Sequence, residues 1–206
     1  MIASAIRPAS HQCLWIGIAL TLAVGLCTEA AAQGIEGRVA IARARDNRDV
    51  VVYVEKIPGR TFSPPQNPVV VDQKNLAFQP HVLPVLVGTR VNFPNSDEVR
   101  HNVFSPTKGA AFDLGSYPLG VSRGRVFDVP GVVTLLCNVH AEMSAYVVVI
   151  ETPYFAVTDR EGRFSIPDVP PGRYQIVTWH ERVKPGRQQV DVTEGRPATM
   201  LFELGR

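Results

Sequence analysis

Short apolar segments separated by turn residues follow one another along most of the chain beyond residue 34. They are rich in Val, Ile and Phe, and Gly, Pro, Asn or Asp borders many of them. This pattern predicts β-strands, and no long helical period interrupts it. The expected strands are residues 37–42, 50–55, 69–71, 82–87, 89–93, 101–104, 126–129, 131–136, 144–150, 155–158, 162–166, 172–178, 188–192 and 198–202. Short strands at this spacing indicate an all-β protein organised as a sandwich or barrel.

Regular turn signals mark off the last part of the chain. Residues 158–162, 169–172 and 193–195 each combine Gly with Asp, Pro or Glu, a composition typical of turns between strands. We therefore expect a small second β-sandwich module, with its boundary near residues 151–153. The expected division is a signal peptide at 1–32, an N-terminal β segment at 33–68, a first sandwich at 69–152 and the second module at 153–206. The sequence leaves open whether residues 35–39 form a strand that pairs with the second module.

The N-terminus carries a pattern of its own. Arg7 and His11 precede the apolar run 14–26, and three alanines follow at 30–32. This is the pattern of a cleaved signal peptide, and the apolar run is shorter than the roughly 20 residues that span a bilayer. We expect an exported chain, periplasmic or secreted, that is not an integral membrane protein after cleavage. An uncleaved anchor and a lipid attachment at Cys27 are the alternatives.

Cleavage of this peptide leaves Cys137 as a lone cysteine, because Cys13 and Cys27 precede the cleavage region. A lone thiol in an oxidising compartment is buried and inert, paired with another chain, or used as a ligand or nucleophile. The 21 basic and 19 acidic residues nearly balance, with a formal net charge of +2. This balance argues against nucleic acid as a partner. Which of the three uses applies to the Cys137 thiol has to be judged from the residues near it in the sequence.

Cys137, His140 and Met143 fall at positions i, i+3 and i+6 of one short loop between two expected strands. A compact loop can direct all three side chains to one point. A thiolate, two imidazoles and a distant thioether form the trigonal set with a weak axial sulfur that suits copper in both of its oxidation states. His101, which follows the polar turn 95–100 and opens an expected strand, is the candidate for the second imidazole. These residues predict a site for one copper ion.

A distant His-Asn pair followed by Cys-x-x-His-x-x-Met resembles the cupredoxin family of plastocyanin and amicyanin, with the loop spacing of amicyanin. The resemblance covers residues 69–150. The whole chain is also similar to the plastocyanin-like methylamine utilisation proteins, in which a cupredoxin domain continues into a module similar to the carboxypeptidase regulatory domain. Unlike most cupredoxins, this chain continues for some 50 residues beyond the strand after the methionine.

The resemblance implies a Greek-key β-sandwich with one type 1 (blue) copper ion, one-electron transfer and a transient redox protein partner. It implies His101, Cys137, His140 and Met143 as the ligands. Asn102 matches the residue that, in such proteins, ties the loop of the upstream ligand to the cysteine loop by hydrogen bonds. The expected protein is therefore an electron carrier and not an enzyme.

Each candidate ligand has a structural alternative. His101 can be a turn histidine bonded to the backbone, Cys137 a buried apolar residue, and Met143 a filler of the core. Glu142 stands beside Met143 and is the alternative axial ligand, and zinc is the alternative metal. An enzyme with Cys137 as nucleophile and His140 as base lacks a convincing orienting acid in the sequence. A multicopper oxidase would require His-x-His pairs, which the sequence does not contain.

The remaining histidines and the C-terminal aromatic residues support further alternatives. His81 opens an expected strand and is a candidate extra ligand, and His180 ends one; for both, a structural role is the expectation. Copper storage or delivery without redox turnover is the alternative function. Binding of carbohydrate or cell-wall material by the second module is another. The aromatic residues that would form a sugar platform are Tyr154, Phe155, Phe164, Tyr174 and Trp179.

Overall fold

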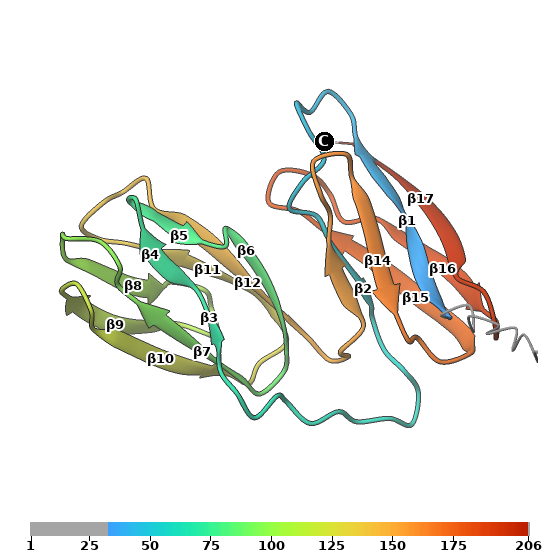
Figure 1. The fold of residues 1–206 in the computed structure, drawn as a ribbon, viewed down its shortest axis with the longest axis horizontal. Coiled ribbons are helices and arrows are strands. Elements are labelled where there is room, and N and C mark those ends of the chain that lie inside the picture. The colour runs from blue at the N-terminus through green and yellow to red at the C-terminus, as the bar shows by residue number, and fades with distance from the viewer. Residues whose placement is uncertain (1–32, 206) are drawn as a thin grey trace, which may run out of the picture. The chain divides into compact units, whose positions relative to one another are not determined.

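A computed structural model describes residues 33–205, which form β-strands and the loops between them (Figure 1). Within this range no helix is long and apolar enough to cross a membrane. The strands are β1 (Gly34–Ile41), β2 (Val51–Val54), β3 (Val69–Val70), β4 (Asp72–Lys74), β5 (Ala77–Gln79), β6 (Val82–Leu86), β7 (Thr89–Pro94), β8 (His101–Ser105), β9 (Phe112–Tyr117), β10 (Ser122–Phe127), β11 (Gly131–Leu136), β12 (Ser144–Ile150), β13 (Phe155–Val157), β14 (Arg163–Pro167), β15 (Gly172–Trp179), β16 (Arg187–Val192) and β17 (Ala198–Leu204). The expected all-β class is confirmed. The expected signal peptide, with Cys13 and Cys27, lies outside the described residues.

Strands β3 to β12 form what we call the first sandwich. One sheet has the order β10-β7-β3 and the other β6-β12-β11-β8-β9, with β4 and β5 as a separate hairpin. Along β11, Val133 and Leu135 point into the core, and Cys137 continues the same alternation just beyond the strand. The period-2 pattern of this strand therefore directs the thiol inward.

The second sandwich consists of the sheets β14-β1-β17 and β13-β2-β15-β16. Strand β1 pairs antiparallel with β14 and parallel with β17, and β2 pairs with β13 and β15. Ile35 and Val39 of β1 are buried in its core against residues such as Phe202. At Gly37, a β-carbon would collide with the backbone carbonyl of Met200, so glycine permits the close approach of β1 and β17. The pairing of residues 35–39 that the sequence left open is thus present, and the first sandwich is inserted between the two parts of the second.

Every strand expected from the sequence has a counterpart, with ends that differ by a few residues. The largest difference is β10, which begins at Ser122, whereas the pattern predicted a start at Val126. Strands β4, β5 and β9 were not predicted. The first two form a short hairpin, and β9 pairs with β8 across a register shift between Asn102 and Phe104.

Candidate metal centre

His101 and Cys137 reach the same place from two neighbouring strands. His101 is the first residue of β8 and is fully buried. Cys137 follows the last residue of β11, which pairs with β8, and 5% of it is exposed. It is a free cysteine in the part of the chain that the structure describes. Because β8 and β11 are held in one sheet, the positions of these two side chains are fixed by backbone pairing.

His140 completes a cluster with these two residues. Its Nδ1 lies 3.0 Å from Nδ1 of His101, and the Cys137 Sγ lies 3.9 Å from that same His101 atom. One donor atom from each of the three residues lies within 4.8 Å of the other two. Two imidazole nitrogens and a thiolate sulfur are a donor set that fits copper, and also zinc. Among the His, Cys, Asp and Glu side chains of residues 33–205, these three lie close enough together to hold a metal ion.

Asn102 ties the two ligand segments together. Its side-chain oxygen accepts a hydrogen bond of 2.6 Å from the backbone N–H of Asn138, the residue after Cys137. Its side-chain nitrogen donates to Asp113 on β9 at 3.2 Å. The structure therefore contains the link between the His101 strand and the cysteine loop that the resemblance implied for this position.

Asp97 orients the ring of His101. Its Oδ2 lies 2.9 Å from His101 Nε2, and its carboxylate also accepts the backbone N–H groups of Asn75 at 2.6 Å and Leu76 at 2.9 Å. Burial raises the pKa of Asp97, but the hydrogen bonds from Leu76, His101 and Asn75 outweigh it, so the pKa lies below its ordinary value. An ionised carboxylate can only accept, so Nε2 of His101 carries a proton. The lone pair of Nδ1 then faces Cys137 and His140, as a metal ligand requires.

Met143 and Glu142 differ in their surroundings. Met143 is 1% exposed and belongs to the core of the first sandwich, whereas Glu142 is exposed. The backbone N–H of Met143 donates to the carbonyl of His140 at 3.0 Å, so the ligand loop closes as a turn. Met143 is buried and lies three residues after His140, so it is favoured over the exposed Glu142 as the axial ligand. This role stays a prediction.

His81 lies outside the cluster and makes other contacts. Its Nδ1 is 3.1 Å from the Ser144 carbonyl oxygen, and its Nε2 is 3.4 Å from Glu181 Oε1. The expected structural role of His81 therefore has specific partners, one of them in the second sandwich. Sequence reasoning did not find Glu181, because it lies 100 positions further along the chain.

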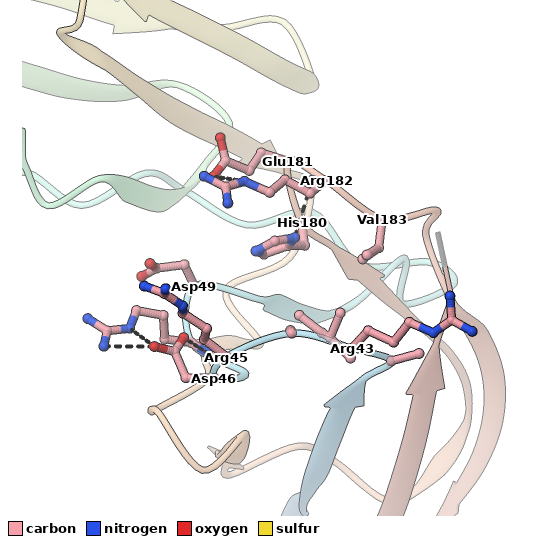
Figure 2. A pocket seen from close by; sticks show the side chains of 12 residues that line it. Arg43, Arg45, Asp46, Asp49, His180, Glu181, Arg182 and Val183 are labelled. Atoms are coloured by element: carbon pink, nitrogen blue, oxygen red, sulfur yellow. Dashed lines mark hydrogen bonds and ion pairs between the residues drawn. The ribbon is translucent and has the colours of Figure 1, made fainter.

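His180 lines a pocket at one end of the second sandwich (Figure 2). The pocket has a volume of about 440 Å³ and includes Arg43, Arg45 and Arg182. Nδ1 of His180 accepts the backbone N–H of Arg182 at 3.2 Å, and burial is the main cause that lowers the pKa of His180. All residues that line this pocket belong to the second sandwich and its loops, so His180 is part of that sandwich and not of the metal cluster.

The aromatic residues considered for a sugar platform are largely packed inside the protein. Phe164 and Tyr174 are buried in the core of the second sandwich, and Tyr154 packs against that core. Phe155 and Trp179 are partly buried against a further apolar cluster. This packing fits the alternative in which strand aromatics fill cores.

Comparisons with known proteins found similarity over parts of the chain. Residues 124–205 match the model of the carboxypeptidase regulatory-like domain family. This segment begins within β10 and includes β11 and β12 of the first sandwich, whereas β1 and β2 of the second sandwich precede it. The chain matches none of the curated proteins with which it was compared.

Among solved structures, a reduced mutant of amicyanin is similar at 25% identity, covering 42% of this chain and 91% of amicyanin, with a TM-score of 0.39. The copper-containing nitrite reductase NirK from Thermus scotoductus SA-01 is similar at 25% identity over 48% of this chain and 25% of the reductase, with a TM-score of 0.40. A purple cupredoxin from Nitrosopumilus maritimus shows 25% identity over 39% of this chain and 98% of its own, with a TM-score of 0.36. Each TM-score lies below 0.5, so the functional proposal that follows rests on the site geometry.

Proposed function

We propose that the protein is an exported type 1 copper protein that carries single electrons between transient redox partners. The observation that carries this proposal is the convergence of His101, Cys137 and His140, with Asp97 fixing the ring of His101. Met143 is proposed as the axial ligand. A copper ion bound by these residues supplies one-electron chemistry, because the ligand set suits both of its oxidation states.

The protein around the cluster favours fast exchange of an electron. His101 and Cys137 are held by paired strands, and the hydrogen bond from Asn138 to Asn102 links their loops. Rigid ligands leave little to rearrange when the charge of the site changes. Burial of the thiol also keeps solvent from reaching the sulfur.

A docking surface is proposed at the end of the first sandwich where His140 is half-buried. Val139 beside it is 51% exposed, and Leu119 and Val99 on the β9–β10 and β7–β8 loops are 53% and 45% exposed. These loops lie at the same end because His101 pairs with Tyr117 at their bases. Exposed apolar side chains around a half-buried ligand suit a small, weak redox contact.

We propose that the protein is not an enzyme. Asp97 and His101 do supply an acid and a base beside Cys137, an arrangement that sequence reasoning had missed. His101 is fully buried, however, and Cys137 is 5% exposed. A nucleophile needs access to its substrate, so this burial favours a ligand role for the thiol.

Export, and the likeness of the whole chain to the plastocyanin-like methylamine utilisation proteins, are part of the same proposal. Export rests on the sequence pattern of residues 1–32. The likeness rests on a first sandwich that is followed along the chain by strands β13 to β17 of a second one. The near balance of charge supports a protein partner in preference to nucleic acid.

A reductive titration of the copper-loaded protein tests the carrier role. We expect the protein to take up one electron per copper ion and to be reduced and reoxidised reversibly over repeated cycles. Cys137→Ala should show no such uptake. A folded wild-type protein that binds copper but does not cycle would instead indicate copper storage or delivery.

A further inference from the structure

An apolar cluster joins strand β2 of the second sandwich to strands β6 and β12 of the first sandwich. Val82 of β6, with Val148 and Ile150 of β12, is buried against Val51 of β2. Val82, Val148 and Ile150 lie on the face of the β6–β12 sheet that is opposite to the core of the first sandwich, since Val147 and Val149 point into that core. The contact therefore places residues of the second sandwich against strand β12, which begins directly after Met143.

A polar contact lies beside this apolar cluster. Glu181, in the loop between β15 and β16, is 3.4 Å from Nε2 of His81, and its side chain is 18% exposed. The ring of Tyr146 contacts His81 edge-on at 5.5 Å between centroids, and it contacts Trp179 at 5.2 Å. Burial and the neighbouring charge of Glu181 raise the pKa of Tyr146.

His81 holds the backbone that follows Met143 at two points. Its Nδ1 lies 3.1 Å from the Ser144 carbonyl oxygen, which can only accept, so Nδ1 carries the proton and donates. Its backbone carbonyl accepts the N–H of Tyr146 at 2.9 Å. On the other side, the N–H of Met143 is bonded to the carbonyl of His140. A change in the position of His81 therefore moves the anchor of the Met143 segment.

We propose that Glu181 of the second sandwich, acting through His81, positions the backbone at Ser144 and thereby sets the placement of Met143 at the metal centre. Both are positioning residues, and the effect on copper rests on the function proposed above. The second sandwich is then a structural part of the redox site. A more weakly held thioether stabilises oxidised copper less, so loss of this contact is expected to raise the reduction potential.

The first arm of the test uses the metal-free protein, so it does not depend on copper. Amide hydrogen exchange is measured for residues 143–146 in Glu181→Ala, His81→Ala and His81→Asn. Exchange should become about threefold to tenfold faster in the first two variants, the range expected for the loss of one hydrogen bond. His81→Asn, whose amide nitrogen can replace Nδ1 as the donor to Ser144, should recover part of the protection. The control is Glu161→Ala, which removes the same carboxylate from a residue that contacts Arg163 instead.

The second arm measures the reduction potential and the electron paramagnetic resonance spectrum of the copper-loaded variants. Glu181→Ala and His81→Ala should shift both the potential and the spectrum from the wild-type values, and Glu161→Ala should not. Unchanged exchange in both variants would overturn the proposal, and so would faster exchange with unchanged potential and spectrum. If the wild-type protein shows no type 1 spectrum while exchange still responds, the proposed function fails and the positioning of the Met143 segment stands.

Discussion

Removal of the Asp97 carboxylate should weaken metal binding while the protein stays folded. In the wild-type protein Nε2 of His101 donates to Asp97 at 2.9 Å, which keeps the lone pair of Nδ1 on the side of Cys137. In Asp97→Ala the proton of His101 is free to move to Nδ1, the atom that must bind the metal. Loss of the outer partner of a ligating histidine typically lowers metal affinity by about 10-fold to 100-fold. At 1.36 kcal/mol per factor of ten, the expected loss of metal-binding free energy is about 1.4–2.7 kcal/mol.

Competition with chelators for copper measures this affinity, and circular dichroism shows that each variant is folded. Asp97→Asn should lose less than Asp97→Ala, because the amide oxygen still accepts one hydrogen bond. Asp128→Ala, at an exposed position of the same sandwich, is the control and should bind like the wild-type protein. If folded Asp97→Ala binds copper with wild-type affinity, the orientation of His101 by Asp97 is not needed and the reasoning fails.

Three other changes test the core, the link between ligand loops and the pH dependence. Leu135→Ala should lower the free energy of unfolding by about 2–5 kcal/mol because Leu135 is fully buried, whereas Leu201→Ala, at a 56% exposed position, should cost far less; urea unfolding compares them. Asn102→Ala removes the acceptor of the Asn138 N–H and should raise the rate of copper loss to a chelator several-fold; an unchanged rate would show that this bond does not hold the loop. Burial lowers the pKa of His180 from 6.5, so the unfolded state binds more protons and stability should fall as the pH drops from about 6.5 through the folded value. His180→Gln should reduce this fall between pH 8 and pH 5.5, and an equal fall in both proteins would contradict the assignment.

The sequence was most informative where a pattern is local. The alternation in β11 predicts both the strand and the inward direction of Cys137, because side chains of a strand alternate between faces. The spacing of Cys137 and His140 within one loop likewise limits how far apart they can lie. The prediction of an all-β fold, which rests on such local patterns, was therefore confirmed, and Cys137 and His140 lie in one cluster.

The sequence was less informative where the structure depends on contacts between distant segments. Strand β1 joins the second sandwich by pairing with β17, some 160 residues later. The sequence of residues 34–41 does not indicate which strand it pairs with. Strands β4 and β5 have only three residues each, and β9 combines charged, small and aromatic residues without clean alternation. Asp97 carried a signal that could have been used, since a carboxylate four residues before a candidate ligand in a turn is well placed to bond to its ring.

The visible absorption spectrum of the protein loaded with Cu(II), compared with that of Cys137→Ser, tests the central claim most directly. Coordination by the Cys137 thiolate predicts an intense thiolate-to-copper band that bleaches on reduction, returns on oxidation and is missing from the serine variant. A folded, copper-loaded wild-type protein without this band, or a serine variant that keeps it, would contradict the assignment of His101, Cys137 and His140 as a type 1 copper centre.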